Sequence, residues 1–147
     1  MAADGCRSAG RGFGVLAAAM LLAGCAVSGT PVTTTPPVST TDLAALRAAV
    51  DEINRAAGDP TAQRRVLEQL VAPAQADEQR HCPQTTNTLT LEPAWPSVSP
   101  RSGTPGAYLV PTLLRVHTDG RITGTDLTAL VFTVQSGRAR TPTLCVS

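Results

Sequence analysis

Hydrophobic side chains recur every three or four residues between residues 42 and 57, which is the spacing of one helix face. Thr41 can cap the start of such a helix, Asp42 suits its first turn, and Gly58 is placed to end it. The pattern predicts a helix with a core-facing stripe made of Leu43, Leu46, Val50, Ile53 and Ala57.

A second helix is predicted to follow at once. Asp59 can cap it, and Pro60 at its first position loses no hydrogen bond, because that amide has no partner inside the helix. Pro73 should stop it, and the polar stretch 74–80 is ambiguous, with room for one more helical turn. The predicted buried side consists of Ala62, Val66, Leu67, Leu70 and Val71.

After Cys82 the pattern changes to alternation, which is typical of strands. Strands are predicted over 85–92, 107–118, 121–135 and 138–146, with a proline-rich loop over 93–106 that contains the single tryptophan, Trp95. Asp119-Gly120 and Ser136-Gly137 are two-residue hairpin signals. Pro111 interrupts the 107–118 strand, which suggests a sheet edge or a bulge. Helices followed by an antiparallel sheet predict an α+β fold: two N-terminal helices on a four-stranded sheet ending in a three-strand meander.

The two hairpin turns predict a register. Val116 would pair with Thr123, Leu114 with Thr125 and Ala129 with Leu144, unless a bulge at Pro111 or Gly124 shifts them. The face carrying Arg115, His117, Asp126 and Cys145 would then be the outer one. The predicted core face consists of Tyr108, Val110, Leu114, Val116, Leu127, Ala129, Val131, Leu144 and Val146.

The N-terminus has the three zones of a secretory signal peptide. Arg7 and Arg11 precede an apolar run over 13–22, and Ala23-Gly24 supplies small residues. The run is shorter than the roughly 20 residues that cross a bilayer. The alternative is a buried N-terminal helix, which the order of the three zones disfavours.

Leu22-Ala23-Gly24-Cys25 resembles the bacterial lipobox. The resemblance implies a diacylglyceryl group on the Cys25 sulfur, cleavage before Cys25 and often acylation of the freed amine. Two or three acyl chains anchor a protein stably. We therefore expect a signal peptide over 1–24 and a protein held by the lipid bilayer at the extracytoplasmic face of the cell membrane.

A stalk is predicted over residues 25–41, followed by one domain over 42–147. The stalk is rich in Thr, Ser and Pro and has no hydrophobic periodicity, so it should stay extended rather than fold. Its threonines are hypothetical glycosylation sites. About one hundred residues then remain, enough for a single small domain.

The charge composition argues against one class of partner. The formal net charge is +1, all twelve basic residues are arginine, and no basic stripe is present, so nucleic acid is not an expected partner.

Four cysteines occur, of which Cys6 would leave with the signal peptide and Cys25 would take the lipid. Cys82 and Cys145 then form an even pair in an oxidising compartment, which predicts a disulfide. The alternatives are two free thiols or a catalytic Cys82.

The element order, the Asp59-Pro60 helix pair, the late meander and the lipobox with its Thr/Pro stalk look like small actinobacterial lipoproteins and secreted antigens. Those proteins have a cone-shaped fold akin to nuclear transport factor and cystatin. The resemblance covers about residues 42–147. It implies an alternative function, because such cones host isomerases and dehydratases that use buried carboxylates, for which Asp126 and Tyr108 are the candidates here.

Four polar residues form a possible ligand face: Tyr108, Arg115, His117 and Asp126, with Asp126 expected to be solvated or paired with Arg115. His81, Cys82, His117 and Cys145 have the residue types of a zinc site but lack close-spaced ligands, so no metal, cofactor or catalytic residue is predicted. We expect a non-catalytic protein that binds an envelope protein or a small ligand. A pocket lined by Tyr108, Leu114 and Val131 would favour the ligand, and an exposed apolar patch, for example around Trp95, would favour the protein.

Overall fold

The computed structural model describes residues 37–146 and shows an α+β domain in which helices pack on an antiparallel sheet. The predicted signal peptide, the lipid site at Cys25 and most of the predicted stalk lie outside the described residues. Within 37–146, none of the helices combines the length and the apolar character needed to cross a membrane.

Both predicted helices are present. Helix α1 spans Thr40–Arg55, and its N-cap is Ser39, whose side chain accepts a hydrogen bond from the Asp42 amide, so the helix begins two residues before the predicted start. Helix α2 spans Pro60–Leu70, and Asp59 caps it as predicted. The ambiguous stretch 74–80 is largely helical, since a 3-10 turn over Pro73–Gln75 leads into α3 over Ala76–Arg80.

The sheet has the strand order β1-β3-β4-β5, with the short β2 also paired to β3. Strands β3 and β4 form the long central hairpin, and both two-residue turns are confirmed, with Asp119, Gly120, Ser136 and Gly137 all at positive φ. A 3-10 turn over Trp95–Ser97 separates β1 from β2 on the same side of β3. The strand bounds are Thr88–Pro93 for β1, Ser99–Pro100 for β2, Ala107–Thr118 for β3, Arg121–Gln135 for β4 and Arg138–Arg140 for β5.

Pro111 lies in the interior of the sheet, which overturns the suggestion of a sheet edge or bulge at this residue. Its carbonyl oxygen accepts the Ala94 amide, 2.8 Å away, in the gap between the end of β1 and the start of β2. A strand residue directs its amide and carbonyl to the same side, so the missing N–H of Pro111 falls in this gap. The proline therefore removes no ladder hydrogen bond.

The predicted register of the central hairpin is wrong by one residue. His117 pairs with Ile122 but Val116 pairs with Gly124, so Thr123 is an extra residue in β4. Because side chains alternate along a strand, this bulge exchanges the two faces of β4 beyond it. Leu127, Ala129 and Val131, predicted to be in the core, lie on the outer face, whereas the core side of β4 carries Thr128, Leu130, Phe132 and Val134.

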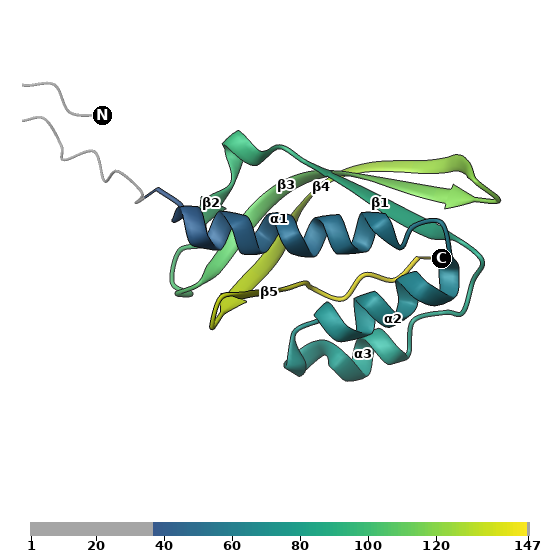
Figure 1. Ribbon diagram of the computed structural model, residues 1–147, viewed down its shortest axis with the longest axis horizontal. Coiled ribbons are helices and arrows are strands. Elements are labelled where there is room, and N and C mark those ends of the chain that lie inside the picture. Colours follow the sequence, from purple (N-terminus) through teal and green to yellow (C-terminus); the bar gives the residue numbers. More distant parts are fainter. Residues whose placement is uncertain (1–36, 147) are drawn as a thin grey trace, which may run out of the picture. The chain divides into compact units, whose positions relative to one another are not determined.

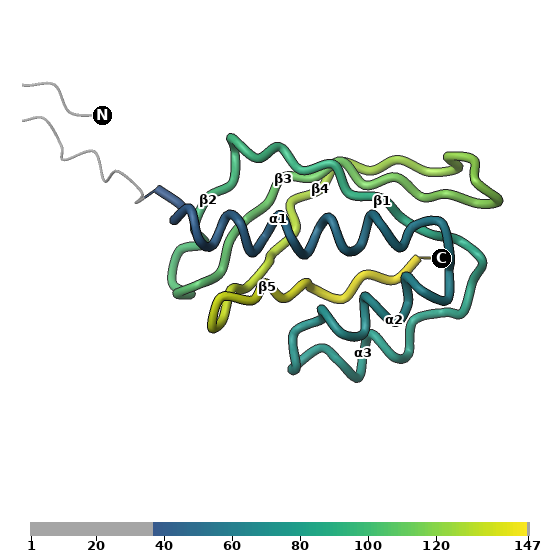
Figure 2. The backbone as a smooth tube through the Cα atoms, in the orientation of Figure 1, coloured from purple at the N-terminus to yellow at the C-terminus, as the bar shows by residue number. Residues whose placement is uncertain are grey.

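The last predicted strand is shorter than expected. Its register agrees with the prediction, since Thr133 pairs with Arg140, but β5 ends there and Leu144 never reaches Ala129. Thr141 instead bridges to Val71 at the end of α2. Figures 1 and 2 show this C-terminal segment, in yellow, running between α1 and α2 and away from β4.

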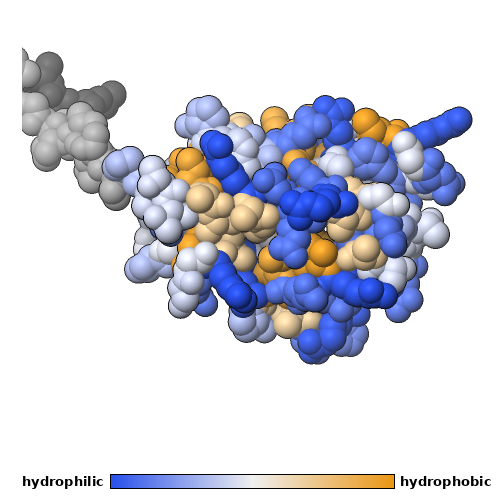
Figure 3. All heavy atoms as spheres, in the orientation of Figure 1, coloured by the Kyte–Doolittle hydropathy of each residue, from blue (hydrophilic) through white to orange (hydrophobic). Residues whose placement is uncertain are grey.

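The core lies between α1 and the inner face of the curled sheet, with α2 packed beside α1 (Figure 1). It is almost entirely aliphatic, as the 3% aromatic content requires. Figure 3 views the helix-covered side, where hydrophilic residues alternate with patches of hydrophobic ones. The least exposed large side chains are Leu46, Ile53, Leu89, Leu91, Val110 and Phe132.

Candidate functional site

Side-chain amides from the helices cover the free edge of β1. The Asn54 side chain of α1 donates to the Leu91 carbonyl and accepts from the Leu91 amide, both at 2.8 Å. Gln63 of α2 does the same for Leu89, at 2.7 and 2.8 Å, and also donates to the Ile53 carbonyl at 3.1 Å. Each carboxamide thus supplies the donor and acceptor that a neighbouring strand would have supplied.

A third amide holds the C-terminal segment in the same manner. Gln79 of α3 donates to the Leu144 carbonyl at 3.1 Å and accepts from the Leu144 amide at 2.9 Å. The predicted disulfide is present beside it, joining Cys82 to Cys145 with their Cα atoms 5.1 Å apart. Thr143 also donates its hydroxyl proton to Glu78 of α3 at 2.9 Å, so hydrogen bonds and the disulfide together tie this segment to α3 and the residues just after it.

The opposite edge of the sheet is open. Over residues 37–146, β5 pairs with β4 only at 133–135. No other segment pairs with the edge of β4 that points away from β3, from Arg121 to Phe132. This stretch carries few charges: after Arg121, only Asp126 is charged. A long open edge with few charges is uncommon, because such an edge offers unpaired amides and carbonyls to another chain.

The outer face of the sheet carries a contiguous hydrophobic surface next to that edge. Three cross-strand pairs make it up, and we call them the apolar patch: Leu109–Val131, Pro111–Ala129 and Leu113–Leu127. Leu127 is 77% exposed, the most exposed large hydrophobic side chain in the described domain. The helices pack on the other face, so this patch faces away from the core.

The structure divides the predicted ligand face. Tyr108 is on the inner face of the sheet, and its hydroxyl donates a hydrogen bond to the Asp42 carboxylate at the start of α1. This hydrogen bond, then desolvation and the Asp42 charge, raise the pKa of the Tyr108 hydroxyl above its ordinary value. Asp126 is also on the inner side, opposite Leu114, because the bulge moved it there.

Arg115 and His117 lie on the outer face, so Arg115 and Asp126 are not paired. Asp126 is exposed, which is the other of its two expected states. The Arg115 Nε atom is instead 2.7 Å from Glu92 on β1. The four residues therefore form no common site. Tyr108, Leu114 and Val131, whose pocket would have favoured a small ligand, do not line a common site, because Val131 is on the opposite face from the other two.

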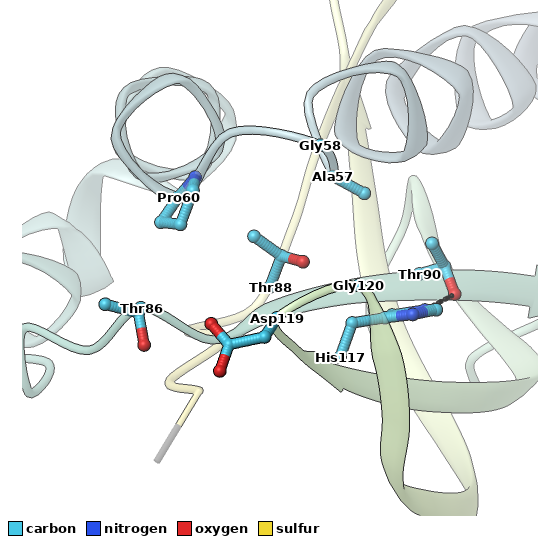
Figure 4. A pocket seen from close by; sticks show the side chains of 9 residues that line it. All are labelled: Ala57, Gly58, Pro60, Thr86, Thr88, Thr90, His117, Asp119 and Gly120. Carbon is cyan, nitrogen blue, oxygen red and sulfur yellow. Dashed lines mark hydrogen bonds between the residues drawn. The ribbon is translucent and has the colours of Figure 1, made fainter.

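A surface pocket of about 400 Å³ lies between the α1–α2 turn and the tip of the central hairpin (Figure 4). His117 Nε2 is hydrogen bonded to Thr90 Oγ1 at 2.9 Å, while the Asp119 side chain points toward the cavity from the turn. The lining offers hydroxyls, one imidazole and one carboxylate. It consists of Ala57, Gly58, Pro60, Thr86, Thr88, Thr90, His117, Asp119 and Gly120.

The disulfide excludes the alternatives considered for Cys82 and Cys145, namely free thiols, a catalytic cysteine and a zinc site, in this structure. Because the sulfur atoms of Cys82 and Cys145 are bonded to each other, neither is available as a nucleophile or as a zinc ligand. His81, the neighbour of Cys82, places its Nδ1 atom 2.7 Å from the Asp77 carbonyl oxygen.

Trp95 is not the centre of an exposed patch. The indole is half-buried against the core, and the Arg47 guanidinium carbon lies 5.2 Å from the centroid of its ring. The apolar patch on the outer face was missed as a surface because its three β4 residues were expected to be core. Pro111 and Gly124 were the two sequence signals for a shifted register, and the bulge lies next to Gly124.

Comparison of this chain with protein-family models, with curated proteins and with solved structures finds no match. The function is therefore argued from the surfaces described above.

Proposed function

We propose that this protein is a lipid-anchored lipoprotein of the bacterial cell envelope that binds a protein partner through the apolar patch. The observation that carries the binding role is the exposed hydrophobic surface of the apolar patch, in which Leu127 is 77% exposed. Contiguous hydrophobic surfaces on small domains are characteristic of protein interaction sites. The core lies on the other face of the sheet, which the helices cover.

The arrangement of the patch suits a protein better than a small molecule. The pairs Leu109–Val131, Pro111–Ala129 and Leu113–Leu127 lie on two adjacent long strands, so they form a surface rather than an enclosed cavity. Small-molecule sites bury most of their ligand in a concave pocket. Ion-paired Arg115 and Glu92 lie beside the patch and give it a polar rim.

Site-specific photocrosslinking in the full-length chain tests the binding role. A photoreactive residue at Ala129, in the patch, should give a discrete crosslinked product in envelope membranes. The same residue at Ala48, which is exposed on α1, is the matched control and should give none. Leu113→Asp should abolish the Ala129 product while leaving the domain folded, since Leu113 is only partly buried. Equal products from Ala129 and Ala48 would contradict the proposal.

The anchor is tested separately by the intact mass of the protein from native membranes. The proposal requires a chain that starts at Cys25 and carries diacylglyceryl, and Cys25→Ser should release the protein from the membrane. Retention of residues 1–24 would contradict the anchor without affecting the binding role.

A further inference from the structure

The described domain has one long sheet edge without cover. Asn54 and Gln63 close the edge of β1, and β5 is only three residues long, with arginines at both ends. Short charged strands are a common protection against edge pairing. The open edge of β4 over Arg121–Phe132 has neither of these protections, and the bulge at Thr123 lies near its start.

An edge of this kind has a definite complement, an extended strand that pairs with its free amides and carbonyls. A second copy of this chain offers such a strand, namely its own β4. Because the described domain has a single long open edge, such pairing would stop at two copies and would not continue into a fibre.

The charge pattern selects a register. In an antiparallel pair of identical strands, the twofold axis is perpendicular to the sheet and passes between two copies of one residue. The largest number of residues in the open stretch Arg121–Phe132 can pair when the residue at the axis is Asp126 or Leu127. An axis at Asp126 would place two carboxylates opposite each other, whereas an axis at Leu127 pairs Asp126 with Thr128 and Thr125 with Ala129.

We propose that the chain forms a symmetric homodimer in which the β4 edges of two copies pair antiparallel, with Leu127 at the twofold axis. A perpendicular axis keeps the two outer faces on the same side of the joined sheet. The apolar patches of the two copies then merge into one surface across the dimer, with the two Leu127 side chains in contact at its centre.

A charge exchange at the axis tests the dimer. Full-length protein is purified in detergent, and its oligomeric mass is measured by native mass spectrometry. The wild type should be a dimer. Leu127→Glu and Leu127→Lys should each weaken the dimer by about tenfold or more, because like charges meet at the axis. Mixing the two variants should restore a dimer containing one copy of each.

The matched control is Leu113→Lys, which adds the same charge to the same face one strand further in. The two copies of residue 113 would be roughly 14 Å apart, three strand spacings, so this variant should remain dimeric. Leu127 is 77% exposed, so its substitution should leave the fold intact, as circular dichroism can verify.

Three results would overturn the inference: a monomeric wild type, single Leu127 variants that remain dimeric, or a mixture of the two that does not associate. A monomeric wild type would leave an extended segment of another protein as the occupant of the edge. In the dimer Ala129 lies opposite Thr125 of the second copy, so an Ala129 product that contains two copies of this chain and persists in Leu113→Asp reports the dimer. The proposed function requires an Ala129 product that contains a different protein and is lost in Leu113→Asp, so the two proposals fail distinguishably.

Discussion

The two long edges of the sheet differ, since helix side chains close the edge of β1 and leave the edge of β4 open. At β1, the carboxamides of Asn54 and Gln63 pair with the backbone of Leu91 and Leu89, so the edge is closed without another strand. At β4, the backbone from Arg121 to Phe132 has no such cover in the described domain. The difference shows that a small domain can close a sheet edge with helix side chains where they are within reach.

The position of the helices explains which edge of the sheet is closed. Helix α1 runs across the inner face, so its last turn and the α2 that follows lie against β1. The C-terminal segment does not cover β4, because Gln79 and the disulfide hold it beside α3. The open edge is therefore a consequence of where the last residues of the domain are tied.

The largest predicted effect follows from releasing that segment with Cys82→Ser and Cys145→Ser together. The disulfide closes a loop with a sequence separation of 63 residues. Its loss should lower the free energy of unfolding by about 4 kcal/mol in the chain-entropy model. Urea unfolding of the wild type, with and without reductant, and of the double variant checks this. A loss below about 1 kcal/mol would show that the hydrogen bonds of the segment, those with Gln79 and Glu78 among them, hold it without the disulfide.

The next effect opens the covered edge. Gln63 is 2% exposed, and Gln63→Ala leaves the Leu89 amide and carbonyl without their side-chain partner. The Ile53 carbonyl would keep the Ala56 amide as its donor. We expect a loss of about 3 kcal/mol in the free energy of unfolding, together with faster hydrogen exchange at Leu89.

The control for this variant is Gln69→Ala on the same helix. Gln69 is exposed, so its removal should change the free energy of unfolding by less than about 0.5 kcal/mol. Equal effects of the two substitutions would mean that the Gln63 side chain does not support the β1 edge.

A smaller effect is expected where α1 is attached to the sheet at its other end. Tyr108→Phe removes the hydrogen bond to Asp42 and should lower the free energy of unfolding by about 1 kcal/mol. The pKa of the Tyr108 hydroxyl is raised, so the folded state holds this proton more tightly than the unfolded state. Wild-type stability should therefore fall as pH rises from about 10 through the folded-state pKa, the ordinary tyrosine value being the lower limit.

Tyr108 is the single tyrosine in the chain, so absorbance of the tyrosinate reports its titration directly. The phenylalanine variant should lack this decline in stability. An ordinary titration in the folded wild type would show that Asp42 does not hold the hydroxyl in solution.

The smallest stability effect is expected at the open edge. Leu127→Ala should change the free energy of unfolding by less than about 0.5 kcal/mol, because the side chain is 77% exposed. Leu89→Ala on β1, at 1% exposure, should cost about 3 kcal/mol. Denaturant unfolding of the two variants at low protein concentration, where any dimer is dissociated, compares the two edges directly. A large loss at Leu127 would place that residue in a core.

The candidate site was less predictable than the fold. The disulfide was accessible from the sequence because only Cys82 and Cys145 remain once Cys6 and Cys25 are assigned elsewhere. The ligand face was not, because Tyr108, Arg115, His117 and Asp126 were grouped by a register that one extra residue overturns. The amide pairs were also missed, since Gln63 and Leu89 are 26 residues apart and neither has a local signal for the contact.

What the sequence alone determined about the described domain was local. The Asp59-Pro60 helix start, the two hairpin turns and the limits of β3 and β4 follow from caps, turn residues and alternation within a few neighbouring positions. The tertiary structure decided which face of β4 is buried and which sheet edge is closed. Both depend on contacts between distant segments, and the bulge at Thr123 exchanges the faces of a strand whose alternation suits either side equally well.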